Sequence, residues 1–221
     1  MSADELERPR QAVIVAGGRG TRLGPLTADR PKALVPVGGR PFIDWLIASL
    51  RDRGFDRILL LLGYRADMVV EHAGTGYPLG VEIETVTTDV DDETGRRFRA
   101  ARDRLDERFL FAYCDNLWPM PWERLWHQYV TARLPGQVVV YANDDEFTRS
   151  NVRVAEGRVE AYDPARAQPG LRGVEIGYAI LERSMLDLLP RENVSLQAGI
   201  YPRLIQRREL GALVTHHRYY S

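Results

Sequence analysis

One lysine stands at the end of a glycine-rich stretch in a chain that otherwise uses arginine for its basic residues. The 221 residues include 30 Lys and Arg, and Lys32 is the single lysine among them. A lysine ammonium is a compact cation with three donors, whereas the guanidinium of arginine is planar and wide. A GC-rich genome would explain the arginines, but it does not explain the exception, which indicates a site that needs a compact cation.

The residues before Lys32 form a loop that could wrap phosphate groups. The stretch AGGRGTRLGPLTADRPK, residues 16–32, follows an apolar run at 11–16. Glycines let backbone N–H groups approach phosphate oxygens, and Arg22 and Lys32 can neutralise their charge. The stretch is not a Walker loop, and Leu23 stands where a dinucleotide-binding fingerprint would have its third glycine.

A carboxylate follows another apolar run. Asp115 lies directly after residues 109–113, between Cys114 and Asn116. Ligands of open α/β sheets bind beyond the carboxyl ends of the strands, where a carboxylate can hold Mg²⁺ against nucleotide phosphates. An aspartate in this position is also a common turn former or helix cap. We predict that Asp115 is a metal ligand and that Cys114, the only cysteine, is a small packed residue.

The elements that must position these residues alternate between strand and helix along the first 141 residues. This pattern predicts an α/β fold with a Rossmann-like, doubly wound, mostly parallel mixed sheet. The second half adds a β-hairpin and further helices, and no linker divides the chain, so we expect a single domain over residues 1–221. Strands are expected at 11–16, 57–62, 81–86, 109–113, 137–141, 151–155, 158–162, 174–181 and 213–215. Helices are expected from Pro41 to near Gly54 and at 66–72, 97–105, 122–133, 184–189 and 195–207.

Composition excludes several classes of protein. The net charge is −1 with no basic block, which argues against a nucleic acid polymer as partner. No apolar run approaches eighteen residues, so no membrane-spanning helix is expected. The polar, acidic N-terminus is unlike a signal peptide, and we expect a cytoplasmic protein. Trp118, Trp122 and Trp126 are expected to form a stripe on one side of a helix, and adjacent His216 and His217 would point to opposite faces of a strand rather than share a metal.

The quoted loop carries a family resemblance. AGGRGTRL at 16–23, RPKALVPV at 30–37, GGRP at 38–41 and GY at 63–64 resemble the signature of the sugar-1-phosphate nucleotidyltransferases, or NDP-sugar pyrophosphorylases. The resemblance implies a nucleotide-diphospho-sugar transferase fold, Mg²⁺ as cofactor and a homo-oligomer. It also implies a nucleoside triphosphate and a sugar 1-phosphate as substrates, with an NDP-sugar and pyrophosphate as products.

The same resemblance implies roles for individual residues. Arg22 would hold the β- and γ-phosphates, Lys32 the α-phosphate and the sugar phosphate, and Asp115 the Mg²⁺. An in-line displacement at the α-phosphorus needs cations and alignment rather than a protein nucleophile or a general base. The nucleotide-binding residues would be Ala16, Gly17, Gly18, Gly20, Thr21, Thr88 and Gly95, and the sugar-binding residues Asn116, Asn151, Tyr162, Asp163 and Glu175.

The second half of the chain resembles particular subgroups. Residues 91–97, 113–116 and 173–181 resemble a subgroup often fused to a histidinol-phosphatase-like phosphatase and associated with activated heptoses, as in D-glycero-D-manno-heptose 1-phosphate guanylyltransferases. Residues 94–99 are also similar to glucose-1-phosphate cytidylyltransferases. A non-catalytic nucleotide-sugar sensor on the same fold is an alternative. A molybdenum-cofactor or isoprenoid-precursor cytidylyltransferase is a further alternative that fits the 31–34 and 63–64 context less well.

The chain also departs from the family pattern. Residues 92–96 replace the common Leu-Gly-Thr-Ala/Gly-Gly stretch, so the base and sugar preferences of glucose enzymes do not transfer. Many members have a second metal-binding aspartate where this chain ends, with Ser221 at the corresponding place. We expect either that one aspartate suffices or that the chain is the N-terminal part of a longer protein.

Overall fold

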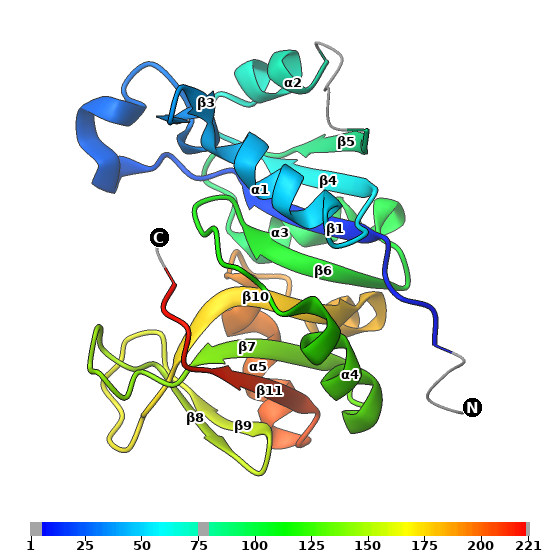
Figure 1. Cartoon of the computed structure of the whole chain (residues 1–221), viewed down its shortest axis with the longest axis vertical. Helices are drawn as coiled ribbons and strands as arrows, with labels where there is room; N and C mark the ends of the chain where they lie inside the picture. The colour runs from blue at the N-terminus through cyan, green and yellow to red at the C-terminus, as the bar shows by residue number, and fades with distance from the viewer. Residues whose placement is uncertain (1–5, 75–79, 220–221) are drawn as a thin grey trace.

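The computed structural model describes residues 6–74 and 80–219, which form a nine-stranded mixed sheet (Figure 1). The strand order is β5-β4-β1-β6-β10-β7-β11-β9-β8. The strands are β1 Gln11–Ala16, β4 Arg57–Leu62, β5 Glu82–Thr87, β6 Arg108–Tyr113, β7 Gly136–Tyr141, β8 Val152–Ala155, β9 Arg158–Tyr162, β10 Val174–Glu182 and β11 Leu210–Thr215. A separate two-stranded ribbon pairs β2 Pro36–Val37 with β3 Arg40–Pro41.

One antiparallel strand joins two parallel parts of this sheet. Strands β5, β4, β1 and β6 are mutually parallel, and β11 is parallel to β7. Strand β10 lies between them and is antiparallel to both β6 and β7. The carboxyl ends of β1, β4 and β6 therefore lie at one edge of the sheet, together with the first residues of β10. The loop after β1 projects from this edge (Figure 1).

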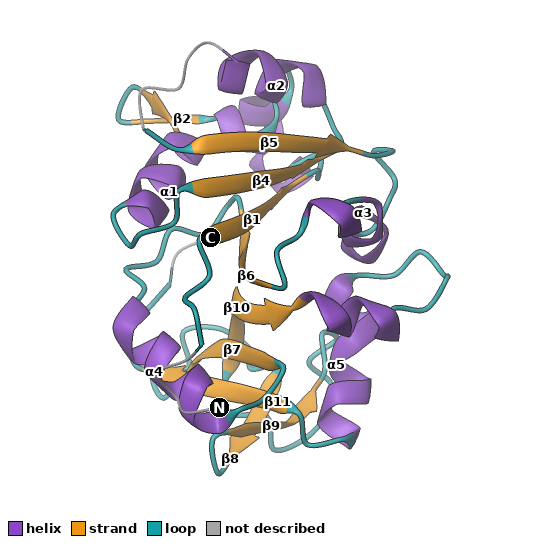
Figure 2. Cartoon of the chain, turned by 90° about the vertical axis from the view of Figure 1, so that its right-hand side faces the viewer, coloured by secondary structure: helices purple, strands orange, loops and turns teal. Residues whose placement is uncertain are grey.

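Helices cover both faces of the sheet, as predicted for a doubly wound fold. Helices α1 and α4 lie on one face and α3 and α5 on the other (Figure 2). Strand β1 is buried along its whole length because apolar side chains on both of its faces enter a core. The helices are α1 Phe42–Arg51, α2 Ala66–Gly74, α3 Thr94–Ala100, α4 Trp122–Ala132 and α5 Leu196–Gln206. Within the described residues, no helix is long and apolar enough to cross a membrane.

Three local predictions were wrong. The helix expected at 97–105 begins at Thr94 and breaks at Ala101, where the backbone leaves helical geometry before a short 3₁₀ turn at Arg102–Arg104. The helix expected at 184–189 is a 3₁₀ helix, Arg183–Leu188; Leu189 is extended because it precedes a proline. Trp118 is buried in the loop before α4 rather than on the helix, since prolines at 119 and 121 prevent an earlier start.

Candidate active site

Lys32 and Asp115, 83 residues apart in sequence, form an ion pair at the carboxyl edge of the sheet. The backbone N–H of Cys114 donates to the carbonyl oxygen of Val15 at 3.1 Å, which keeps the chain after β6 paired with β1. Asp115 is thereby held beside the loop that follows β1. Each of the two side chains is 22% exposed, so the pair is reachable from solvent but partly desolvated. The fold therefore brings together Lys32, from the loop after β1, and Asp115, which follows β6.

Gly20 and Thr27 hold the stem of Lys32 in place within the loop. Gly20 has a left-handed backbone (φ 66°), and a Cβ at this position would lie 3.1 Å from the Cβ of Lys32. The hydroxyl of Thr27 donates to the carbonyl oxygens of Gly20 (3.0 Å) and Gly24 (3.2 Å), which closes the turn. The stem of Lys32 thus packs on a backbone that only glycine adopts without strain.

Other loop residues face outward. Arg22 and Thr21 are exposed, and the side chain of Arg22 has no hydrogen bond or ion pair within the described part of the chain. An added Cβ at Gly18 would meet open space. The structure does not bring Arg22 into contact with Lys32 or Asp115; it leaves the guanidinium available to an anion.

The burial of Cys114 excludes it from nucleophilic chemistry. Burial, followed by the charge of Asp115, raises the pKa of the thiol to about 12, so the sulfur stays protonated at neutral pH. Cys114 is 7% exposed and belongs to the core beneath the site. The prediction that it is a packed residue agrees with this environment.

The donor set at this edge fits Mg²⁺ held mostly by substrate. Among the described residues, no three His, Cys, Asp or Glu side chains gather into a ready-made metal site. Mg²⁺ commonly takes one or two protein carboxylates and completes its shell with phosphate oxygens and water. Asp115, a partly exposed carboxylate beside a phosphate-type loop, matches that requirement.

A buried arginine that was not predicted from the sequence contacts residues expected to bind the nucleotide. Arg97 on α3 is 3% exposed and donates to the carbonyl oxygen of Leu62 and to the hydroxyl of Thr88, both at 2.7 Å. A Cβ added to Gly17 would lie 2.4 Å from its Cζ, and one added to Gly63 would lie 2.5 Å from its Nη1. The sequence signal that could have indicated its burial is helical periodicity, because Arg97 lies four residues before the apolar Ala101.

Three other residues expected at the nucleotide lie at the ends of the elements next to this arginine. Ala16 is buried at the end of β1, and Thr88 follows β5. The N–H of Gly95 donates to the carbonyl oxygen of Val194 at 3.0 Å, and a Cβ at Gly95 would lie 2.6 Å from that oxygen. Gly95 therefore holds α3 against the segment before α5, and its N–H is already engaged.

The residues expected at the sugar form a connected cluster at the start of β10. The side-chain oxygen of Asn151 accepts from the Glu175 N–H at 2.9 Å, and Glu175 Oε1 accepts from the Gly177 N–H at 2.8 Å. Burial raises the pKa of the Glu175 carboxyl to about 7, an effect that the Gly177 N–H partly offsets. Tyr162 lies edge-to-face with Tyr201, with ring centroids 5.1 Å apart. Burial, followed by the charge of Glu175, raises the pKa of both tyrosine hydroxyls, so a carboxyl group and two aromatic rings lie close together at the start of β10.

Two further residues predicted to bind the sugar, Asn116 and Asp163, form hydrogen bonds within the protein. Asn116 is 3% exposed and donates through its amide to the carbonyl oxygen of Ile176, which ties the β6 end to β10. Its Oδ1 is buried without a hydrogen-bond partner among the described residues. Asp163 accepts from three backbone N–H groups at 165, 167 and 168, and these bonds hold its pKa below the usual range. Asp163 thus shapes the turn after β9.

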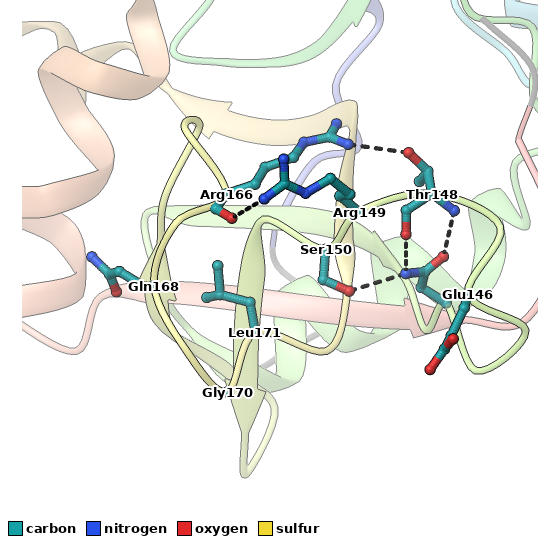
Figure 3. Close-up of a pocket in the computed structure, with 9 residues that line it drawn as sticks. Glu146, Thr148, Arg149, Ser150, Arg166, Gln168, Gly170 and Leu171 are labelled. Atoms are coloured by element: carbon teal, nitrogen blue, oxygen red, sulfur yellow. Dashed lines mark hydrogen bonds between the residues drawn. The ribbon is translucent and has the colours of Figure 1, made fainter.

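A separate surface pocket lies between the loops that flank the hairpin (Figure 3). Arg166 donates to the Thr148 hydroxyl at 3.1 Å, and Arg149 donates to the Arg166 carbonyl oxygen at 3.2 Å. Glu146 lies beside Thr148, and its carboxylate points away from the two guanidinium groups (Figure 3). None of the residues expected to bind substrate lines it.

The sheet and the charged edge define an α/β protein with a candidate site at the carboxyl ends of its strands, the place where ligands of such sheets bind. The family model described as Nucleotidyl transferase matches residues 11–147, and the chain belongs to that family. This match includes the loop with Lys32 and the strand that leads to Asp115.

Curated relatives differ in the base and the sugar that their names specify. A UTP–glucose-1-phosphate uridylyltransferase of Haloferax volcanii is 33% identical over 48% of this chain and 44% of its own length. A mannose-1-phosphate guanylyltransferase of Mycobacterium tuberculosis is 28% identical over 88% of this chain and 55% of its own length. A Bacillus subtilis protein named as a probable glucose-1-phosphate cytidylyltransferase is 26% identical over 82% of this chain and 78% of its own. The chain spans about half the length of the first two.

Solved structures share the fold. HddC of Yersinia pseudotuberculosis superposes with a TM-score of 0.78 at 20% identity, covering 96% of this chain and 92% of HddC. The inositol-1-phosphate CTP transferase of T. maritima gives a TM-score of 0.77 at 19% identity, covering 94% of this chain and 86% of that one. These matches confirm the predicted nucleotide-diphospho-sugar transferase fold.

Proposed function

We propose that the chain transfers a nucleotidyl group from a nucleoside triphosphate to a sugar 1-phosphate and releases pyrophosphate. The observation that supports this most strongly is the Lys32–Asp115 pair beneath the glycine-rich loop, in a chain that belongs to the nucleotidyl transferase family. Curated relatives are named as transferases of this kind with different bases.

The chemistry follows from charge and alignment. An oxygen of the sugar phosphate attacks the α-phosphorus, the bond to the bridging β-oxygen breaks, and pyrophosphate leaves with that electron pair. Because the attacking phosphate is already ionised, no general base is needed. A Mg²⁺ ion on Asp115 would supply further positive charge to the phosphates.

The two cations of the candidate site, Lys32 and Arg22, have distinct roles in this reaction. Lys32 is neutralised by Asp115 when no substrate is bound, and it turns to the α-phosphate and the sugar phosphate when they enter. Arg22, which has no partner among the described residues, binds the β- and γ-phosphates and stabilises the leaving pyrophosphate.

For the substrates, we propose a heptose 1-phosphate and GTP. This pair rests on the resemblance of residues 91–97, 113–116 and 173–181 to the heptose-associated subgroup. A glucose-1-phosphate cytidylyltransferase activity is the second candidate, favoured by the name of the Bacillus subtilis relative, which aligns over most of both chains.

The test is pyrophosphate release in Mg²⁺ with ATP, CTP, GTP, UTP and dTTP against a panel of sugar 1-phosphates that includes heptose and glucose 1-phosphates. Release is expected with one pair, and Lys32→Ala is expected to lower the turnover number by roughly 100- to 1,000-fold. Nucleotide binding without release from any pair would instead support a non-catalytic sensor.

A further inference from the structure

Two arginines, Arg149 and Arg166, line the surface pocket between residues 143–150 and 163–171 (Figure 3). Their hydrogen bonds go to neutral oxygens: Arg166 donates to the Thr148 hydroxyl at 3.1 Å, and Arg149 donates to the Arg166 carbonyl oxygen at 3.2 Å. Within the described residues, neither arginine forms an ion pair. Arg149 is exposed and Arg166 is half-buried, so both guanidinium groups can be reached from solvent.

The acidic side chains of the first of these loops are directed elsewhere. The Asp144 carboxylate lies 3.0 Å from a ring nitrogen of His216. Asp145 forms an ion pair with Arg218 at 2.5 Å. Glu146 lines the pocket, but its carboxylate points away from the two guanidinium groups (Figure 3). The pocket therefore has positive charge that its own loops do not neutralise, which favours an anionic ligand.

The hydrogen bonds of the two arginines leave donors available to such a ligand. Arg166 uses Nη1 for Thr148, and its Nε and Nη2 have no acceptor among the described residues. These two nitrogens present neighbouring N–H groups in one plane, the edge of a guanidinium that binds two oxygens of a phosphate. Arg149 uses Nη2, and within the same part of the chain its Nε and Nη1 also have no acceptor.

The pocket is held in shape by buried hydrogen bonds. Asn143 is 7% exposed and donates to the Thr148 carbonyl oxygen at 2.7 Å and to the Ser150 hydroxyl at 3.0 Å. Its side-chain oxygen accepts from the Thr148 N–H at 3.2 Å. Glu146 and Arg166 have left-handed backbones (φ 51° and 57°), which are uncommon for such residues and are often found at ligand sites. A ligand would therefore meet walls that are already ordered, which lowers the cost of binding.

The pocket is large enough for a small molecule and adjoins the residues predicted to bind the sugar. Its volume is about 490 Å³, within the range of roughly 300–1,000 Å³ that is usual for small-molecule sites. Ser150 lines it and directly precedes Asn151. Burial, followed by the charge of Glu175, raises the pKa of the Tyr162 hydroxyl, and the charge of Arg166 opposes this rise. Arg166 therefore lies within electrostatic reach of the sugar cluster.

We propose that Arg149 and Arg166 form a binding site for the phosphate group of a small molecule, separate from Lys32 and Asp115. A phosphate monoester has close to two negative charges at neutral pH and three acceptor oxygens, which suits two guanidinium groups. The phosphate has two possible sources, a separate phosphorylated molecule or a second phosphate on the sugar 1-phosphate. The site goes beyond the proposed nucleotidyl transfer, because none of the residues assigned to that reaction lines the pocket.

The test is a titration with inorganic phosphate, followed through the backbone amide NMR signals of residues 143–150 and 163–171. Wild-type protein is compared with the double variant Arg149→Gln/Arg166→Gln. Arg207→Gln is the matched control, because Arg207 is an exposed arginine that lies 3.9 Å from Glu209 and does not line the pocket. Lys32→Ala shows which signals report phosphate at the candidate active site instead.

Phosphate is expected to shift these amide signals in the wild type, in Lys32→Ala and in Arg207→Gln with affinities that agree within about twofold. It should bind the double variant at least tenfold more weakly, because charge-assisted hydrogen bonds are lost. If circular dichroism shows that the double variant is unfolded, Arg149→Gln alone decides, with affinity lowered by roughly threefold or more. Absence of shifts in the wild type, or unchanged affinity in the folded variant, would overturn the proposal.

Glucose 6-phosphate and glucose 1,6-bisphosphate then distinguish the two sources. If the ligand is a separate molecule, both compounds should bind the pocket with similar affinity, and Lys32→Ala should not change it. If the pocket holds a second phosphate of the substrate, the bisphosphate should bind at least tenfold more tightly, and both Lys32→Ala and the double variant should lose that gain. Absence of pyrophosphate release alongside intact phosphate binding would contradict the proposed function but not this inference.

Discussion

At the scale of single residues, the candidate site combines a lysine that has an ion pair with a buried arginine whose acceptors are neutral. Lys32 pairs with Asp115, a carboxylate that can turn to a metal ion, and Arg97 is held by neutral oxygens. Glu175 is different, since burial raises the pKa of its carboxyl and, among the described residues, no basic side chain forms an ion pair with it. The candidate site thus combines one acid that has no ion pair within the described part of the chain, Glu175, with one that is paired to a lysine, Asp115.

Glu175 provides a prediction about pH. Its pKa in the folded protein is raised to about 7 from 4.5, so between these values the folded state binds more protons than the unfolded state and stability falls as pH rises. Glu175→Gln resembles the protonated side chain. We expect the variant to be more stable than the parent at pH 8 by roughly 1–3 kcal/mol and equally stable at pH 4, measured by urea unfolding. Equal stabilities at pH 8 would contradict this expectation.

At the scale of elements, the sequence predicts strands well and their irregularities poorly. The buried strands β1, β4, β6 and β7 were located within a residue or so, because runs of apolar residues report burial directly. The register shift in β10 between Glu175 and Ala179, with Gly177 at φ 77°, has no such signal. Periodicity reports which face is buried but not which distant group accepts a hydrogen bond, and for that reason Arg97 was missed.

The contact between α3 and the segment before α5 provides a second prediction. A methyl group at Gly95 would lie 2.6 Å from the Val194 carbonyl oxygen, a backbone atom that cannot move aside alone. We expect Gly95→Ala to lower the free energy of unfolding by about 1–3 kcal/mol. Gly74→Ala is the control, since nothing lies within 4 Å of the added carbon and it ends a helix. Thermal unfolding of both variants checks this, and equal midpoints would contradict it.

At the scale of the whole molecule, β10 couples the two parallel parts of the sheet next to the site. The loop with Lys32 and the aspartate after β6 could be predicted from the sequence because each follows an apolar run. Their assembly with residues 151–175 could not, because it depends on a strand that enters the sheet in the opposite direction. The coupling is made by Asn116, which donates to Ile176, and by Tyr178, whose hydroxyl donates to the Asn116 carbonyl oxygen at 2.7 Å.

The Tyr178 hydroxyl therefore provides a test of whether this coupling positions Asp115. Tyr178 is 1% exposed, so Tyr178→Phe leaves the Asn116 carbonyl oxygen without its buried donor and should cost about 1–3 kcal/mol of stability. Because Asn116 is next to Asp115, we also expect turnover to fall by roughly tenfold or more through misalignment of the carboxylate.

Tyr129→Phe is the matched control for this experiment. Tyr129 is 3% exposed, and its hydroxyl bonds to Arg108 at 2.9 Å and Glu182 at 3.0 Å, at the opposite end of β6 from Asp115. Its loss should reduce stability by a similar amount while the turnover number stays unchanged. Turnover measured by pyrophosphate release, alongside urea unfolding, separates the two effects. If both variants lost stability and neither lost turnover, β10 would support the fold without positioning the Asp115 carboxylate.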